Sequence, residues 1–392
     1  MGYITRHLER KLEQSLQNYP VVAILGPRQC GKSTLAGEVI SKHSSWIKLD
    51  LEKQSDLVQL EEAELFFNLY RNKQICLDEI QRKPELFSSM RPFIDEENRN
   101  GLFLILGSAS RDQIKQSSET LAGRILYLEL SPLRLSEIYK AANDFTTSIQ
   151  THWLRGGFPR AFLSGSDALA FEWIDSFIIT FLERDLPQLD FNIPPKTLHR
   201  FWRMLSHVHG QVLNKSKLGE SLGISHTTMG KYVEILVGTY MIRLLEPFEA
   251  NVKKRVIKSP KLYFRDTGIL HALQSIHTFE NLHSHPIIGS SWEGYVIENI
   301  IGEMADWEPM FYRTSNGSEI DLILKKGQRV LAFECKVSPA PKLTRGFWNA
   351  IEDVKPEKTF IVASAKQAYL IKKDVLVCNL SELLDILPEL SS

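Results

Sequence analysis

Two widely separated groups of residues in this chain have the types and spacing of phosphate chemistry. Near the amino end, Gly26-Pro27-Arg28-Gln29-Cys30-Gly31-Lys32-Ser33 has the spacing of a Walker A phosphate-binding loop. Far downstream, Asp321 is followed by Glu334-Cys335-Lys336, which is the spacing of a Mg²⁺-dependent nuclease centre. Both chemistries use the same metal ion. The pairing raises the question of what nucleotide binding at one end would control at the other.

The Walker A segment has the flanking elements that a phosphate-binding loop needs. A continuous apolar run at residues 21–25 predicts a buried strand before it, and a helix is predicted to open at Ser33. Backbone N–H groups of such a loop wrap the phosphates, and the helix amino end adds partial positive charge. We expect Lys32 to reach the β- and γ-phosphates and the Ser33 hydroxyl to hold Mg²⁺. ATP and Mg²⁺ are thus the expected cofactors, and the expected nucleotide-binding residues are Gly26, Pro27, Arg28, Gln29, Cys30, Gly31, Lys32, Ser33 and Thr34.

The segment Ile75–Glu79 is the natural Walker B motif. Its apolar residues predict a strand that carries Asp78 to the phosphate edge of the sheet, where the carboxylate would hold Mg²⁺ through water. Glu79 is then placed to polarise the attacking water as a catalytic base. A helix cap or a solvated turn is the alternative for an acidic pair after a buried strand.

Two further residues in this half are candidates for sensing or stabilising the phosphates. Ser108 follows an apolar run and would contact the γ-phosphate, although a plain turn explains it equally well. Arg124 follows Leu121-Ala122-Gly123 and is a candidate arginine finger, which would neutralise charge on the transferred phosphoryl group. A surface arginine in a turn is the alternative for Arg124.

These residues require a sheet that brings strand ends together. Residues 7–18 predict a helix, because leucines recur at every fourth position. Five apolar runs separated by helical stretches predict a doubly wound parallel α/β sheet with its ligand at the carboxyl ends of the strands. The runs are residues 21–25, 46–50, 75–79, 102–110 and 124–130.

The middle of the chain predicts a helical connector followed by a winged helix. Residues 150–200 are rich in aromatic residues and helix formers, with an amphipathic helix expected over 177–186. Residues 217–236 have the pattern of a helix-turn-helix, and 241–264 predict a hairpin. We expect DNA phosphates to be contacted by Thr227, Thr228, Lys231 and the hairpin residues Lys253, Lys254, Arg255, Lys258 and Lys261. A rigid spacer or protein interface with a solvated basic hairpin is the alternative.

The carboxyl-terminal segment predicts a small α/β domain that collects the acidic residues. A helix is expected from Trp292, strands over 311–313, 319–324 and 330–337, and a further strand over 359–363. Period-two alternation places Glu334 and Lys336 on one side of their strand, where Asp321 of the neighbouring strand can meet them. Two carboxylates suit Mg²⁺ or Mn²⁺ rather than zinc, Glu293 would complete the metal shell, and Lys336 would orient the nucleophile or stabilise charge. Chance alternation of acidic and basic residues on an exposed strand is the alternative.

Composition excludes several classes of protein. The 392 residues carry 47 basic and 47 acidic side chains, so nucleic acid would be bound by a local patch rather than by a globally positive field. The four cysteines form no CxxC pair, which argues against a zinc site. We expect a cytoplasmic protein with no membrane partner, because no signal peptide or membrane-length apolar run is present.

The order of the motifs resembles the prokaryotic AAA+-type ATPases with a C-terminal DUF4143 domain, over nearly the whole chain. The motifs are GPRQCGKST, LDEIQ, LILGSAS, LAGR followed by LSPLRLSEI, GGFP, LERDL, LYFRDTGIL, GSSWEGYVIENI and the paired EID…ECK. The resemblance implies an ASCE-type P-loop core and a restriction-endonuclease-like, PD-(D/E)xK-type tail. Lys32, Ser33, Asp78 and Glu79 match the ATP site, and Glu293, Asp321, Glu334 and Lys336 match the nuclease-like site. Leu106 stands where family members often have threonine, which weakens the assignment of Ser108 as a sensor.

We therefore expect an ATPase domain over 1–145, a helical connector over 146–200, a winged-helix-like domain over 201–265 and a nuclease-like domain over 266–392. One hypothesis is an ATP-regulated, Mg²⁺-dependent nucleic-acid enzyme, with DNA favoured over RNA as the partner. The other is an ATP-dependent switch or scaffold whose inactive nuclease-like tail binds DNA or a partner protein. A homo-oligomer fits either hypothesis, and Arg124 would act either in its own subunit or in a neighbouring one.

Overall fold

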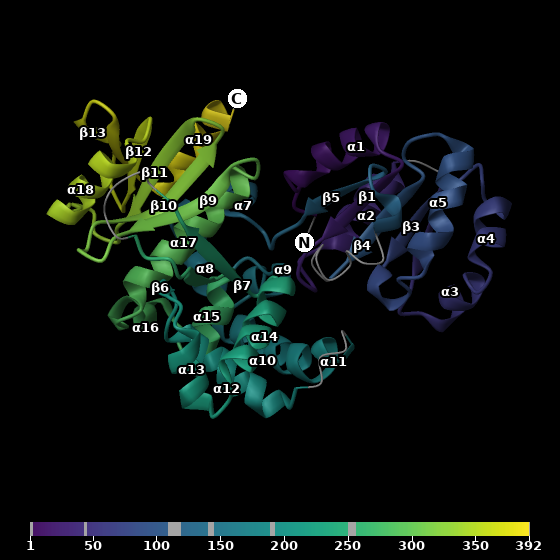
Figure 1. The fold of residues 1–392 in the computed structure, drawn as a ribbon, viewed down its shortest axis with the longest axis horizontal. Helices are drawn as coiled ribbons and strands as arrows, with labels where there is room; N and C mark the ends of the chain where they lie inside the picture. Colours follow the sequence, from purple (N-terminus) through teal and green to yellow (C-terminus); the bar gives the residue numbers. More distant parts are fainter. Residues whose placement is uncertain are drawn as a thin grey trace. The chain divides into compact units, whose positions relative to one another are not determined.

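The computed structural model describes residues 3–42, 45–108, 119–139, 145–188, 193–249 and 256–391 (Figure 1). The chain divides into two compact units. The first comprises residues 1–133 together with 234–241, and the second comprises 134–233 together with 242–392. Along the described parts of the chain, no helix is both long and apolar enough to cross a membrane.

The first unit is built on a five-stranded sheet whose neighbouring strands are all parallel (Figure 1). Its strand order is β2-β3-β4-β1-β5, so β4 separates the strand of the Walker A motif, β1, from the strand of the Walker B motif, β3. This order agrees with the ASCE-type core that the resemblance implies. The strands are β1 (Val21–Leu25), β2 (Trp46–Asp50), β3 (Gln74–Asp78), β4 (Phe103–Gly107) and β5 (Ile125–Glu129).

Helices cover both faces of this sheet, because nearly every residue of β1 and β4 is apolar and each strand buries its side chains on both sides. On one face, α1 and α2 pack through Leu12 and Leu35 in a core that includes Val22 and Leu104. On the other face, Phe67 of α4 and Phe93 of α5 pack on Phe103 with ring centroids 5.1 and 5.9 Å apart. The predicted doubly wound sheet is confirmed. The helical segments of this unit are α1 (Leu8–Asn18), α2 (Lys32–Ser41), α3 (Gln54–Gln59), α4 (Ala63–Leu69), η1 (Ile80–Arg82), α5 (Leu86–Glu97) and η2 (Glu119–Leu121).

The second unit contains a nine-stranded mixed sheet with the order β13-β14-β12-β11-β10-β9-β7-β8-β6. The hairpin expected over 241–264 forms as β7 and β8, and β7 pairs in parallel with β9 of the carboxyl-terminal strands. The hairpin and the nuclease-like strands therefore share one sheet, a continuity that local sequence pattern does not contain. The strands are β6 (Gln211–Val212), β7 (Ile242–Pro247), β8 (Lys261–Phe264), β9 (Glu308–Arg313), β10 (Glu319–Lys326), β11 (Arg329–Cys335), β12 (Lys358–Val362), β13 (Tyr369–Lys372) and β14 (Val375–Cys378).

Two helices of the second unit begin earlier than expected, and one of them is α17, which begins at Ile288 rather than Trp292. The helix predicted over 177–186 begins earlier, at Asp167, because Ser166 caps it by accepting a hydrogen bond from the Leu169 N–H, and it continues as a π-helical turn over Phe181–Asp185. The helical segments are α7 (Leu135–Ile138), α8 (Phe145–Arg155), α9 (Pro159–Phe162), α10 (Asp167–Thr180), the π-helical turn η4 (Phe181–Asp185), α11 (Leu186–Gln188), α12 (Pro195–Ser206), α13 (Lys215–Leu222), α14 (His226–Gly238), α15 (Thr267–Leu273), α16 (Phe279–Ser284), α17 (Ile288–Glu303), α18 (Arg345–Val354) and α19 (Leu380–Ser391). The end of α14, from residue 234, belongs to the first unit.

The predicted helix-turn-helix is present as α13 and α14. Gly223 ends α13 in the left-handed conformation at φ 69°, and the Ser225 hydroxyl caps α14 by accepting from the Thr228 N–H at 3.1 Å. Thr227 and Lys231 are exposed, as a phosphate contact would require. The basic hairpin residues Lys253, Lys254 and Arg255 lie outside the described residues.

A buried histidine, His209, links β8 to α17 in the second unit. Its Nδ1 accepts from the Phe264 N–H at 3.0 Å, so its Nε2 carries the proton and donates to the Ser290 carbonyl, also at 3.0 Å. A Cβ at position 294 would lie 2.5 Å from this Nε2, which is why α17 has glycine there. Burial lowers the pKa of His209 to about 3. The ring is therefore neutral in the folded protein over the whole range near neutrality.

We expect this histidine to make the second unit acid-sensitive. The pKa of His209 is lower in the folded state than its unfolded value of about 6.5, so the folded state gains stability above that pH and loses it as pH falls toward 3. At pH 4.5 the loss should be about 3 kcal/mol. The measurement is denaturant unfolding followed by tryptophan fluorescence, because every tryptophan except Trp46 lies in the second unit.

The matched control replaces an exposed histidine of the same unit. His209→Gln should flatten the pH dependence of the unfolding free energy between pH 7 and 4.5, whereas His226→Gln should leave it unchanged. Equal slopes for His209→Gln and the wild type would contradict the assignment.

Candidate nucleotide site and acidic cluster

The lysine of the Walker A loop donates hydrogen bonds back to the carbonyl groups of the loop. Lys32 is 5% exposed and its Nζ donates to the carbonyls of Gly26 and Pro27 at 2.9 and 2.8 Å. Gly26 is required by close approach, since a Cβ there would lie 2.1 Å from the Leu130 carbonyl oxygen. The ammonium thus lies against the loop carbonyls at the amino end of α2.

A second cation, Arg6, also bonds to the phosphate-binding loop, and the sequence reasoning missed it. Arg6 is 4% exposed, and its guanidinium donates to the Cys30 carbonyl at 3.0 Å and to the Ser131 carbonyl at 2.7 Å. It therefore ties the phosphate-binding loop to the segment that follows β5. A basic residue before an amphipathic helix is too common a pattern to have revealed this role.

The strand register brings the Walker B residues to the same edge of the sheet as the loop. β1 and β4 end together at Leu25 and Gly107, and β3 ends at Asp78 beside them. Asp78 is 6% exposed, with Lys48 Nζ 3.6 Å from one carboxylate oxygen, Oδ2. The other oxygen, Oδ1, is buried with no hydrogen-bond partner among the described residues. An unpartnered buried carboxylate oxygen at a phosphate edge fits a cation or its water shell.

Two polar side chains, Ser108 and Gln81, donate hydrogen bonds to the carboxylate of Glu79. Glu79 adopts the left-handed conformation at φ 59°, which turns its side chain away from the direction of β3. Its Oε2 accepts from the Ser108 hydroxyl at 3.2 Å and from the Gln81 amide, and Gln81 Nε2 also donates to Ser108 Oγ at 2.8 Å. The structure therefore places Ser108 next to the candidate base, and it adds Gln81, which the sequence reasoning did not single out.

Arg124 lies at the opposite edge of the sheet. It immediately precedes β5, whose first residue pairs with Val21 at the start of β1, and its Nε donates to Asp95 Oδ1 at 2.7 Å. The five residues of β5 separate it from the phosphate edge by about 16 Å. The structure therefore does not bring Arg124 to the phosphate edge of its own chain. Its role as an arginine finger stays a prediction.

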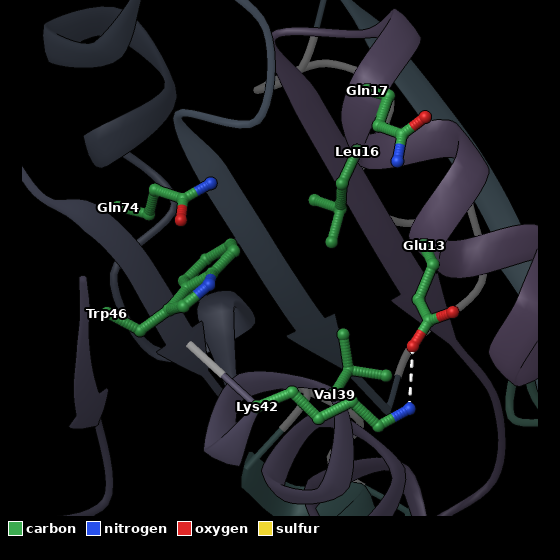
Figure 2. Close-up of a pocket in the computed structure, with 7 residues that line it drawn as sticks. All are labelled: Glu13, Leu16, Gln17, Val39, Lys42, Trp46 and Gln74. Carbon is green, nitrogen blue, oxygen red and sulfur yellow. Dashed lines mark hydrogen bonds and ion pairs between the residues drawn. The ribbon is translucent and has the colours of Figure 1, made fainter. Parts of the chain in front are cut away.

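A pocket of about 480 Å³ in the first unit is also distant from the phosphate edge (Figure 2). Trp46 and Gln74, the first residues of β2 and β3, are paired on its wall, and Lys42 forms an ion pair across it with Glu13 at 2.7 Å. The pocket opens at the amino ends of the strands and is separate from the nucleotide site.

The nuclease-like residues meet on two neighbouring antiparallel strands, as predicted. Asp321 lies on β10 and Glu334 on β11, each 7% exposed. Asp321 Oδ2 accepts from the Cys335 N–H at 2.9 Å, and Lys336 Nζ donates to Glu334 Oε1 at 2.5 Å. Glu334 Oε2 is buried without a hydrogen-bond partner among the described residues.

The electrostatics of this pair follow from burial. Burial first, and the charge of Asp321 second, raise the pKa of Glu334 to about 8. The pKa of Asp321 is also raised, by burial and by the charge of Glu293. Two buried carboxylates this close favour a bound proton or a bound cation between them.

A buried lysine enters the acidic cluster, and this finding corrects the prediction for it. Lys261, assigned to a basic, nucleic-acid-contacting hairpin, is 2% exposed. Its Nζ lies 2.7 Å from Glu319 Oε1, 3.1 Å from Glu293 Oε1 and 3.8 Å from Asp321 Oδ1. Burial alone would lower the pKa of Lys261, but these carboxylates raise it above its ordinary value, so it remains an ammonium.

Tyr263 lies on the same side of β8 and also donates to Glu293, at 2.5 Å. The signal for both contacts was the period-two alternation of β8, which places Lys261 and Tyr263 on one face. Glu293 is consequently engaged by two donors. Over the ranges that the model describes, no three acidic, histidine or cysteine side chains are arranged to hold a metal ion together. The predicted site of Glu293, Asp321 and Glu334 is thus not preassembled, because an ammonium already lies among its carboxylates.

Three family models match this chain. An AAA domain matches residues 18–139, a domain of unknown function (DUF8612) matches 146–280, and a domain of unknown function (DUF4143) matches 288–383. The chain is similar to the uncharacterized protein Mb2031c of Mycobacterium bovis and the uncharacterized protein Rv2008c of Mycobacterium tuberculosis. Each is 36% identical over 379 residues, which cover 97% of this chain and 84% of the relative.

Among solved structures, the Walker-type ATPase PABY2304 of Pyrococcus abyssi has a TM-score of 0.49 at 15% identity, covering 69% of this chain and 96% of that one. The signal transduction ATPase PH0952 of Pyrococcus horikoshii has a TM-score of 0.30 at 13% identity, covering 76% of this chain and 48% of that one. Since both TM-scores are below 0.5, the fold is assigned from the strand order given above.

Proposed function

The chain belongs to the family of AAA-domain ATPases with a C-terminal DUF4143 domain, and from this premise we propose that ATP bound in its first unit controls a Mg²⁺-dependent nucleic-acid-processing site in its second. One observation carries the proposal. Each predicted metal site contains a buried carboxylate oxygen without a partner among the described residues, Asp78 Oδ1 in one and Glu334 Oε2 in the other. Such oxygens are costly to bury unless a cation or its water completes them.

In the nucleotide site, Lys32 would exchange a loop carbonyl for the β- and γ-phosphate oxygens, while the loop N–H groups bind the remaining oxygens. Asp78 and the exposed Ser33 hydroxyl are the residues that would hold Mg²⁺, which supplies charge neutralisation at the phosphates. Glu79, oriented by Ser108, would accept the proton of the attacking water.

In the acidic cluster, Asp321 and Glu334 are the residues that would hold the divalent ion, which supplies activation of water beside a phosphodiester. Lys336 would stabilise negative charge on the phosphate, since its ammonium already lies against Glu334. DNA is the proposed partner, with phosphate contacts from the exposed side of α13 and α14.

The test is cleavage of single- and double-stranded DNA by the full chain in Mg²⁺ and in Mn²⁺, with and without ATP. Glu334→Ala should abolish cleavage, because it removes a metal-binding carboxylate. Glu308→Ala, an exposed acid on β9 of the same sheet, should leave cleavage unchanged. Cleavage that persists in Glu334→Ala would contradict the assignment of the site, and cleavage that is independent of ATP would contradict the control by the first unit.

The position of Lys261 favours a second candidate function. An ATP-dependent switch, whose nuclease-like domain binds DNA or a partner protein without cutting, needs no metal ion, and Lys261 already places a positive charge beside Glu293 and Glu319. Mg²⁺- and Mn²⁺-independent DNA binding with no cleavage under any condition would support this candidate over the first.

A further inference from the structure

We propose that Lys261 is a built-in cation at the metal position of the nuclease-like site, and that it competes with a divalent metal ion for Glu293 and Asp321. The inference rests on the proposed metal-binding role of that site and adds its regulation. It arises from the side-chain geometry of β8, α17 and β10 within the second unit.

The Lys261 ammonium is enclosed by carboxylates. Lys261 Nζ lies within ion-pair distance of carboxylates from two elements that are far apart in sequence, Glu293 of α17 and both Glu319 and Asp321 of β10. A surface lysine would not be 2% exposed and would not face three acids. Its ammonium also lies 5.6 Å from the centre of the Phe311 ring, so the aromatic face of β9 completes the enclosure.

The carboxylates of the cluster outnumber its cations. Among the described residues, four buried or half-buried carboxylates of the cluster face three cations. The carboxylates are Glu293, Glu319, Asp321 and Glu334, and the cations are Lys261, Lys336 and Arg313. Removal of the Lys261 charge would leave these four carboxylates facing two cations, and a divalent cation would then neutralise the added negative charge.

One carboxylate oxygen of the cluster, on Glu334, is not bonded by Lys261. Glu334 Oε2 is buried and has no partner among the described residues, and the charge of Asp321 acts on the same carboxyl group. A divalent ion has room in its coordination sphere for oxygens from both Asp321 and Glu334, whereas among the described residues the Lys261 ammonium pairs with Asp321 and not with Glu334. The cluster is therefore suited to a metal ion but is held by a lysine, so metal binding requires the ammonium to leave Asp321.

The experiment measures Mn²⁺ affinity of the full chain by isothermal titration calorimetry without nucleotide, so that the ATP site does not contribute a metal–nucleotide complex. The variant is Lys261→Met, which keeps an unbranched apolar stem against Phe311 and removes the charge. The control is Lys325→Met, which removes an exposed lysine of β10. Lys261→Met should bind Mn²⁺ at least tenfold more tightly than the wild type and Lys325→Met, and the added Glu334→Ala change should remove the gain.

Equal Mn²⁺ affinity in Lys261→Met and the wild type would overturn the inference. If Lys261→Met does not fold, recovery of its folded circular dichroism spectrum in Mn²⁺ but not in K⁺ supports the inference, since the divalent ion then takes the place of the ammonium. Failure of Mn²⁺ to restore the fold of Lys261→Met and also of Lys261→Gln, which retains a donor for Glu293, would overturn it.

The DNA cleavage assay separates this inference from the proposed function. Tight Mn²⁺ binding by Lys261→Met without cleavage by any form would uphold the competing lysine and reject the nuclease. Metal-dependent cleavage by the wild type, together with unchanged Mn²⁺ affinity in Lys261→Met, would uphold the nuclease and reject the competing lysine.

Discussion

Lys32→Ala should lower the affinity for ATP by roughly 10²- to 10⁴-fold. The lysine is expected to make two charge-assisted hydrogen bonds to the phosphates, each worth about 1.5–3 kcal/mol, and each 1.4 kcal/mol is a factor of ten. Its present bonds to the Gly26 and Pro27 carbonyls show that the ammonium is already at the loop. The same substitution also removes the internal support of the loop, which adds to the loss.

The measurement is calorimetric titration of the full chain with ATP and Mg²⁺. Lys42→Ala is the matched control, because Lys42 follows the other end of α2 and pairs with Glu9 and Glu13 at 2.7 Å, away from the phosphate edge. ATP affinity in Lys32→Ala within threefold of the wild type would reject the Walker A assignment.

Glu79→Gln should reduce ATP hydrolysis by roughly 10²- to 10³-fold, because general-base catalysis contributes at least this much. ATP affinity should change by no more than about threefold, since each good hydrogen bond contributes only about 1 kcal/mol and the amide can still accept from Ser108. The variant should therefore hold ATP in a stable complex.

Steady-state phosphate release and ATP titration on the same preparation check this separation of binding from chemistry. Glu61→Gln, an exposed acid of the first unit, serves as the control for loss of one negative charge. Hydrolysis at the wild-type rate in Glu79→Gln would show that another group activates the water, and Glu79 would then be a structural partner of Ser108 and Gln81.

The amino-acid sequence was sufficient for features that depend on local spacing. The five strands of the first unit are short, mainly apolar segments, and the phosphate-binding loop is recognisable because glycine, lysine and serine must stand at fixed offsets between a strand and a helix. The same holds for Glu334 and Lys336, whose shared face follows from the two-residue period of a strand. Local periodicity determines such features whatever the rest of the chain does.

Contacts between residues far apart in the chain depended on the tertiary structure. The parallel register of β5 with β1 placed Arg124 at the end of the sheet opposite the phosphates, and Glu79, in the left-handed conformation, bonds to Ser108. Sequence pattern assigned Lys261 to a basic hairpin that either contacts nucleic acid or is solvated, because a lysine beside other basic residues is usually exposed. The pairing of β7 with β9 instead joins the hairpin to the nuclease-like strands, and this buries Lys261 among carboxylates that lie between 32 and 60 residues further along the chain. Long-range strand pairing is not encoded in any local window, so the cation in the acidic cluster could be found only in the folded protein.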